Sequence, residues 1–389
     1  MLISSSQTIP RSIWALGFVS LFMDMSSEYI HSLLPVFMVS VLGSSMIWVG
    51  FVEGIAEAVS LIIRLFSGLL SDYLGKRKAL TLCGYGLSMI TKPFFPLANS
   101  IGTIIIARTL DRVGKGIRSA PRDALIADLA PQEIRGACFG LRQTLDTIGA
   151  ILGPLLAIVL MIIANENIRI ILWVAVIPAF ISILILYIFV TEPKHIQSVK
   201  NPYVFKISIL TSLNKNFWYL IITNCCLNMA RFSEAFLILK GQSSGLSLSL
   251  TPLILIVMSI IYALTVYPIG KLSDKKNRYL LLIPGIIFLF LAHLVLGFSS
   301  HIITVFFGVI LWGLHMGCTQ GLLSALVTDT TPAELRGTAY GIFNLTSGIT
   351  LFSASFFAGF IWDQWGSQYT FFLGAFFSLI TLIVLSIKK

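Results

Sequence analysis

Charged residues are scarce in this chain of 389 residues: Asp, Glu, Lys and Arg make up 11% of it, whereas hydrophobic residues make up 56%. A soluble globular domain carries about 25% charged residues, so the composition argues against a soluble protein. The charges sum to +10, but most basic residues lie between apolar runs of membrane-span length instead of forming the basic surface of a nucleic-acid-binding protein. We therefore expect a membrane protein with no nucleic acid partner.

Cysteine is also scarce, and no two of the five cysteines have the spacing C-x-x-C. All five lie within apolar segments, which predicts small buried side chains and gives no sign of a disulfide framework or a metal site. The sequence contains no HExxH, GxSxG or Walker motif, so nothing supports a membrane-embedded enzyme. No cofactor is expected.

Apolar runs dominate what remains, and twelve of them are long enough to span a hydrocarbon core of about 30 Å. The first six are residues 12–40, 46–70, 79–97, 101–127, 138–162 and 170–190. After a polar stretch, the last six are residues 217–239, 250–271, 279–298, 302–328, 338–361 and 369–387. The predicted fold is an all-α membrane protein of twelve transmembrane helices in the lipid bilayer.

Lysine and arginine are distributed unequally between the two sides of these spans. Of the 27, 16 fall in segments on the side of the N-terminus, 2 on the opposite side and 9 within spans. Because cytoplasmic loops carry an excess of these residues, both termini are predicted to be cytoplasmic. The first apolar run carries Asp24 and Glu28 and lacks a cleavage site, so we expect a retained span of a multi-pass inner-membrane protein.

The two halves of the chain repeat each other. Residues 124–140 match residues 325–341 at an offset of 201, and residues 68–72 match residues 270–274 at an offset of 202. Two matches at nearly one offset indicate a duplicated six-span unit, which places a binding site between the units near the bilayer midplane. The predicted division is an N-terminal bundle over 1–190, a cytoplasmic linker over 191–215 and a C-terminal bundle over 216–389.

A motif of glycine and charged residues, GLLSDYLGKRK, joins the second and third spans. Its key residues are Gly68, Asp72, Gly75, Lys76 and Arg77. A degenerate copy between spans 8 and 9 holds Gly270, Asp274 and Arg278, and span 5 holds Gly149, Gly153 and Pro154. With twelve spans and duplicated halves, the chain resembles the major facilitator superfamily, whose signature G-x-x-x-D-x-x-G-[RK]-[RK] this motif matches.

The resemblance implies two six-helix bundles that alternate in access, with spans 1, 4, 7 and 10 around a central cavity. It also implies that the motif and Asp274 form a cytoplasmic gate, in which Asp72 and Arg77 stabilise the outward-open state. Topological anchoring of the loop is the alternative. A channel is disfavoured, because duplicated halves with a gate fit a carrier.

Span 4 is unusually rich in charge. It contains Arg108, Asp111, Arg112, Lys115, Arg118, Arg122 and Asp123. Because charge at the bilayer centre costs about 2.5–3.5 kcal/mol on insertion scales, these side chains must face protein or a water-filled cavity. Arg112 lies about 16 Å beyond Ile101, near mid-membrane. Gly114 and Gly116 thin the helix around Lys115, which would let a ligand or another helix approach.

This surplus of positive charge predicts an anionic substrate, which arginine can grip in a bidentate way. The candidate substrate-binding residues are Arg112, Lys115, Arg118, Arg231, Asn228 and His315. A carboxylate siderophore, an organic acid and a phosphorylated metabolite all fit, and the direction of transport stays open. Structural ion pairing of the span-4 bases is one alternative, and a multidrug/H+ efflux transporter of the same fold is another.

Acidic residues in the spans are candidates for proton coupling. Asp24, Glu28 and His31 share one face of the span-1 helix. Asp24 and Glu28 are the predicted proton carriers, with a fixed ion pair to span 4 as the alternative. Two sets are expected to be structural, Arg142 with Asp146, and Glu53 and Glu57 with Arg64. A monomer is expected.

Overall fold

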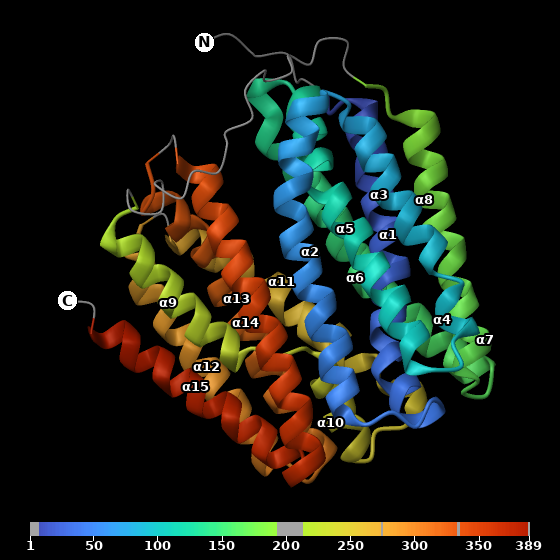
Figure 1. The fold of residues 1–389 in the computed structure, drawn as a ribbon, viewed down its shortest axis with the longest axis vertical. Helices are drawn as coiled ribbons and strands as arrows, with labels where there is room; N and C mark the ends of the chain where they lie inside the picture. Colours follow the sequence, from blue (N-terminus) through green and yellow to red (C-terminus); the bar gives the residue numbers. More distant parts are fainter. Residues whose placement is uncertain (1–7, 193–212, 274, 333–334, 388–389) are drawn as a thin grey trace.

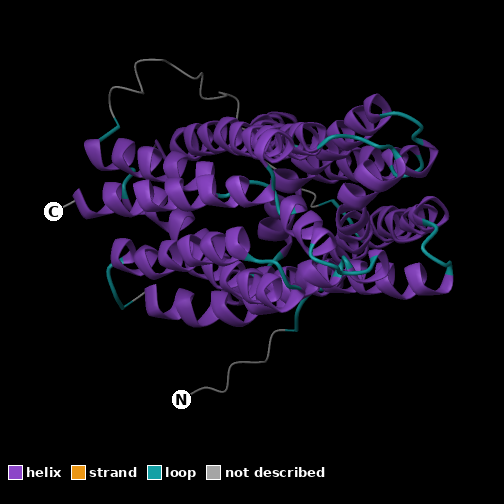
Figure 2. Cartoon of the chain, turned by 90° about the horizontal axis from the view of Figure 1, so that it is seen from below, coloured by secondary structure: helices purple, strands orange, loops and turns teal. Residues whose placement is uncertain are grey.

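The computed structural model describes residues 8–192, 213–273, 275–332 and 335–387. Within these ranges the chain is almost entirely helical and contains no strand (Figures 1 and 2). The first helices are α1 (Arg11–Val36), α2 (Met46–Leu74), α3 (Arg77–Thr91), α4 (Phe94–Leu97), α5 (Ile101–Leu129), α6 (Arg135–Ile163), α7 (Ile168–Leu172) and α8 (Val176–Phe189). The later helices are α9 (Lys215–Ala230), α10 (Ala235–Ser243), α11 (Leu253–Ser273), α12 (Arg278–Phe298), α13 (Ile302–Asp329), α14 (Arg336–Trp365) and α15 (Ser367–Ile387).

These helices coincide with the twelve predicted spans and confirm the all-α membrane fold. Three spans consist of two helices each, namely α3 with α4, α7 with α8, and α9 with α10. Eight helical segments of the described chain are long and apolar enough to cross a membrane by length and composition alone. Helix α5 is not among them, because eight charged residues interrupt its apolar character. The exact boundaries of the two bundles and the linker stay a prediction, since residues 193–212 lie outside the described ranges.

Helix α6 packs closely on α1, and the glycines of the span-5 motif explain how. A Cβ atom at Gly149 would lie 2.3 Å from the carbonyl oxygen of Leu21, and one at Gly153 would lie 2.4 Å from that of Met25. Such distances are far below van der Waals contact, so any larger residue would force the two helices apart. The motif therefore sets the spacing of spans 1 and 5.

The two ends of the molecule differ in how the N-terminal helices (α1–α8) meet the C-terminal helices (α9–α15). At the end that holds the GLLSDYLGKRK motif, called the motif end, the ion pairs of the described residues stay within one set of helices: Arg77 with Asp72 and Asp128, and Arg278 with Asp329. The helices of the two sets also diverge toward this end in Figure 1.

At the opposite end, hydrogen bonds join the two sets of helices. Asp363, at the end of α14, accepts hydrogen bonds from the backbone N–H groups of Met46 and Ile47 at 2.9 and 2.8 Å. Two further contacts there join Gln242 to Ser40 at 3.0 Å and Ser249 to Glu166 at 2.7 Å. The structure is therefore tied together at the opposite end.

Candidate functional site

A cavity of about 220 Å³ lies where the N-terminal and C-terminal helices meet. Its wall consists of Glu28, His31, Glu53, Glu57, Arg112, Lys115, Arg231, Phe232, Ser233, Glu234, Leu351 and Ser355. These residues come from α1, α2, α5, the segment between α9 and α10, and α14. Span 10, expected to line the cavity by resemblance, contributes none of the described lining residues, whereas spans 2 and 11 do. Four acids and three bases of the wall give it both signs of charge.

The helix of span 7 breaks at residues 231–234, called the span-7 break, where the sequence predicts continuous helix. The break leaves backbone groups without helical partners, and neighbouring side chains supply them. The Ser233 N–H donates to the Ser355 hydroxyl at 3.1 Å, and a His293 ring nitrogen lies 2.9 Å from the Ala230 carbonyl oxygen. Irregular backbone at membrane depth is tolerated only where it is satisfied in this way or lines a cavity.

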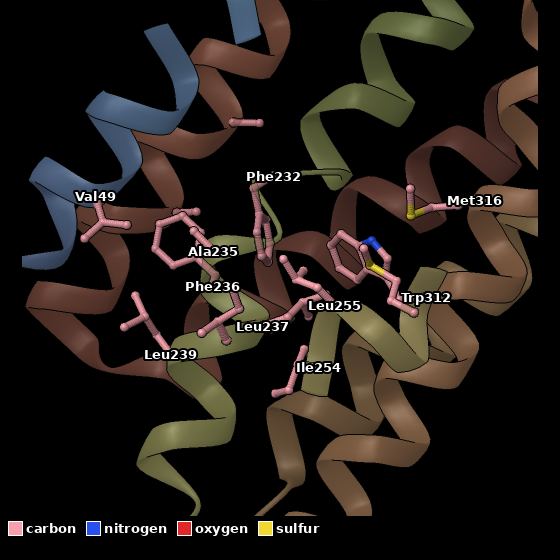
Figure 3. Packing of buried hydrophobic residues seen from close by; sticks show 14 of the residues in the cluster. Val49, Phe232, Ala235, Phe236, Leu237, Leu239, Ile254, Leu255, Trp312 and Met316 are labelled. Atoms are coloured by element: carbon pink, nitrogen blue, oxygen red, sulfur yellow. The ribbon is translucent and has the colours of Figure 1, made fainter. Parts of the chain in front are cut away.

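Phe232 anchors the break in the hydrophobic core. Its ring is 2% exposed, and the ring centroids of Trp312, His293 and Phe371 lie 5.7, 5.3 and 5.7 Å away. Figure 3 shows Phe232 between Phe236 and Trp312. Because the aromatic ring holds the backbone, the flanking side chains of Arg231 and Glu234 are left at the cavity wall.

On the N-terminal side of the cavity, charged groups form a chain across three helices. Nδ1 of His31 lies 3.1 Å from the Glu28 carboxylate, and Nε2 lies 3.5 Å from that of Glu53. Glu53 in turn accepts a hydrogen bond from Arg108 at 2.8 Å, and both side chains are 1% exposed. Buried charges are costly unless paired, so this chain is a fixed part of the wall.

Three span-4 bases predicted to bind substrate occupy different surroundings. Arg112 lies at the wall, 3.8 Å from Glu57. Lys115 also lines the cavity, and no carboxylate of the described residues lies within 4 Å of its ammonium group. Arg118 faces away: it donates to the Ser88 hydroxyl at 2.5 Å and its guanidinium lies 4.7 Å from the Tyr85 ring centroid.

The glycines beside Lys115 serve helix packing. A Cβ atom at Gly114 would lie 2.6 Å from the Gly84 carbonyl oxygen of α3, and one at Gly116 would lie 2.7 Å from Ile63 of α2. Of the two outcomes that the sequence left open, it is another helix that approaches at these positions. Close neighbours on both sides fix the rotation of α5 and so direct Lys115 toward the cavity.

Asn228 and His315, also predicted to bind substrate, are buried away from the cavity wall. Asn228 lies in the last turn of α9, and its carbonyl oxygen accepts a hydrogen bond from the Arg231 N–H at 3.1 Å. Nδ1 of His315 lies 2.9 Å from the Gly285 carbonyl oxygen of α12. The structure does not bring either residue, or Arg118, into the cavity, and their binding roles stay predictions.

The two predicted proton carriers also differ in position. Glu28 lines the cavity, but Asp24 lies one turn away, where its carboxyl group neighbours the Asp146 carboxyl group of α6. The expected pair of Arg142 with Asp146 is present at 3.3 Å. Arg122 of α5 lies 3.9 Å from Asp146 as well.

The expected set of Glu53 and Glu57 with Arg64 is wrong. Arg64 is exposed and lies 3.5 Å from Asp123, whereas the two glutamates pair with Arg108 and Arg112. Arg64 lies about 10 Å farther along α2 than Glu57, because seven helical residues rise about 1.5 Å each. It therefore meets the part of α5 nearer the motif end.

The motif residues take the positions that a tight loop requires. Gly75 ends α2 with φ of 61°, a left-handed conformation that favours glycine, and exposed Lys76 precedes α3. Gly68 lies in the last turns of α2, and Arg77 reaches Asp72 at 3.6 Å. Asp274 lies outside the described residues. Among described residues, no group of three or more His, Cys, Asp or Glu side chains could hold a metal ion.

Comparisons with known proteins give one consistent result. The Major Facilitator Superfamily profile matches residues 16–355. An uncharacterized MFS-type transporter of Methanocaldococcus jannaschii is 30% identical over 98% of this chain and 96% of its own length. The inner membrane transport protein YajR of Escherichia coli is 24% identical over 97% of this chain and 83% of its own length, and the multidrug resistance protein MdtH of Photorhabdus laumondii is 23% identical over 99% and 95%. A solved nucleoside transporter shares the fold with a TM-score of 0.84, at 13% identity over 97% of this chain and 100% of its own.

Proposed function

Since the chain belongs to the major facilitator superfamily and is a membrane transporter, we propose that it moves a small organic anion across the inner membrane by alternating access. The supporting observation is that Lys115 of α5 and Arg231 of the span-7 break line one cavity from opposite sides of the bundle interface. Neither base has a described carboxylate within 4 Å. An anion placed between them would supply the missing counter-charge.

We further propose an orientation of the molecule in the membrane. The lysine and arginine bias predicts that the motif end and both termini lie in the cytoplasm. The contacts that tie Asp363 to α2 then close the periplasmic side, and the described structure corresponds to an inward-open state. The gate role of the motif belongs to the other state, in which its residues would meet the C-terminal helices.

Proton coupling is the second part of the proposal, and it centres on Asp24. The Asp24 and Asp146 carboxyl groups are neighbours where α1 packs on α6, and a proton on one of them would relieve the repulsion between two carboxylates. The charged groups around the pair are Arg122, Arg142, Lys115 and Arg118. Lys115 also faces the cavity, so a bound anion and this proton would act on the same ammonium group. Glu28 is held by His31 and is therefore the less suitable of the two candidates to gain and lose the coupled proton.

The test uses purified protein and a thermal-shift screen of small carboxylates and phosphate esters at constant ionic strength, with sodium chloride as the blank. We expect at least one anion to raise the melting temperature of the wild type and to have no effect on Lys115→Gln or Arg231→Gln. Arg64→Gln, which removes an exposed base outside the cavity, is the matched control. A hit is then tested by counterflow in liposomes, which a carrier supports and a channel does not. Equal stabilisation of wild type and Lys115→Gln would contradict the proposal.

Multidrug efflux is the second candidate, and the acids and apolar side chains in the same wall favour it. Glu234 and Glu57 face the cavity together with the apolar side chain of Leu351, which suits a lipophilic cation. The same screen with tetraphenylphosphonium and ethidium separates the two candidates. Stabilisation by these cations and by no anion would favour efflux of drugs.

A further inference from the structure

The charged groups of the cavity divide into those that already have partners and those that do not. Glu28, His31 and Glu53 belong to the chain that ends on Arg108, and Arg112 lies near Glu57. Lys115, Arg231 and Glu234 remain. Among the described residues, none of these three has an oppositely charged group within 4 Å. The cavity thus presents two positive groups and one negative group to whatever enters it.

Glu234 is the informative member of this set. It is the residue that precedes α10, where a carboxylate often caps the helix, but its side chain makes no capping hydrogen bond. Its backbone is engaged: the carbonyl oxygen accepts hydrogen bonds from the N–H groups of Leu237 and Ile238 at 2.9 and 3.3 Å. The backbone is therefore held in place while the carboxylate faces the cavity.

A plain anion would satisfy the two bases and leave this carboxylate beside its own negative charge. Phe232 is packed against Trp312 and the Ser233 N–H is bonded to Ser355, so the backbone between Arg231 and Glu234 is held in place. A ligand with a positive group in addition to its negative groups would give Lys115, Arg231 and Glu234 each an oppositely charged partner. Ammonium groups donate strong hydrogen bonds to carboxylates, which makes this arrangement selective as well as favourable.

We infer that the substrate is a small zwitterion, with acidic groups held by Lys115 and Arg231 and a protonated amine held by Glu234. This inference rests on the proposed function, since it names the substrate class for the same cavity. The volume of about 220 Å³ accommodates a ligand of the size of an amino acid or an amino phosphate. Lys115 lies on an N-terminal helix and the other two residues lie in the span-7 break, so the ligand bridges the two sets of helices.

The experiment uses pairs of probes that differ only in the amine: glutamate with glutarate, aspartate with succinate, and phosphoethanolamine with ethyl phosphate. Affinities are measured on the purified full-length protein by thermal shift and by isothermal titration calorimetry. For at least one pair, we expect the amine-bearing member to bind about tenfold or more tightly, the size of effect typical of a hydrogen bond to a charged group. Glu234→Gln should abolish this preference and leave the affinity for the amine-free member within about threefold.

Two further variants separate the possible outcomes. Lys115→Gln should weaken both members of the pair, and Glu133→Gln, which neutralises an exposed acid outside the cavity, should change neither. Elution as a single symmetric peak in size exclusion shows that each variant is folded. If acids bind but the amine brings no preference, the zwitterion inference fails and the anion proposal stands. If no probe of any pair binds, or only tetraphenylphosphonium binds, both fail. Retained preference in a folded Glu234→Gln overturns the role of Glu234.

Discussion

Removal of the Asp363 side chain should open the end of the molecule that Asp363 holds closed. Ser45 occupies the N-cap position of α2 but makes no side-chain capping bond. The first two N–H groups of α2, those of Met46 and Ile47, donate to Asp363 of α14. A residue from the C-terminal helices thus caps a helix of the N-terminal set, and the cap exists only while this end is closed.

The size of the effect follows from this geometry. Loss of an N-cap side chain costs about 0.5–2 kcal/mol, and a carboxylate at a helix N-terminus gains about 0.3–1 kcal/mol from the helix dipole when exposed. Asp363 is exposed, so we take about 1–2 kcal/mol for Asp363→Ala. Because 1–2 kcal/mol is a factor of about 5–30 in an equilibrium, the population open at this end should rise by that factor.

The assay follows the labelling of a cysteine that only the open state exposes. Val49 of α2 is fully buried in the cluster shared with Phe236 of α10 (Figure 3), so Val49→Cys in a background without native cysteines reports opening. Maleimide labelling should accelerate by about 5–30-fold in Asp363→Ala. Asp363→Asn, which keeps an oxygen acceptor, should accelerate labelling by less than about threefold. Equal labelling rates in Asp363→Ala and the parent would refute the idea that this cap holds the closed end.

Three further substitutions test other parts of the structure. Phe232→Ala should lower the free energy of unfolding by about 3–5 kcal/mol, seen as a lower melting temperature, and should weaken ligand binding because the span-7 break loses its anchor. Glu53→Gln should destabilise the protein by about 3–5 kcal/mol by leaving Arg108 unpaired, and the double variant with Arg108→Gln should be less destabilised than the sum of the single variants, as measured by a thermal double-mutant cycle. Asp24→Asn should make substrate uptake into liposomes insensitive to an imposed pH gradient, whereas counterflow without a gradient should persist; unchanged pH-driven uptake would exclude Asp24 as the proton carrier.

Helix content and the position of Lys115 could be predicted from the sequence because they depend on local composition. Long apolar runs required helices in a bilayer, and Lys115, placed near mid-membrane between two glycines, does line the cavity. The side of α5 on which Arg118 lies could also be predicted from the sequence. It lies six residues after Arg112, a rotation of 600°, which puts it about 120° around the helix and toward α3.

The span-7 break could not be predicted, because nothing local produces it. Residues 230–235, ARFSEA, contain neither proline nor glycine, and a charged pair in an apolar segment was the only signal. The break is held by His293 and Ser355, which lie more than 60 residues away in sequence. The meeting of Asp24 with Asp146 is of the same kind, since it depends on how α1 packs on α6.

Charge is distributed unevenly between the two sets of helices, and this explains why Arg231 and Glu234 lack partners in their own bundle. The bases and acids of α1, α2, α3 and α5 mostly neutralise one another, as in the pairs of Arg108 with Glu53 and Lys92 with Asp111. Of the C-terminal residues that line the cavity, only Arg231 and Glu234 are charged, and both lie in the break. A charge without a partner in its own bundle is costly at membrane depth. Its partner must then come from across the interface or from a ligand, so changes at Arg231 or Glu234 should alter binding more than stability, and changes in the N-terminal pairs should do the reverse.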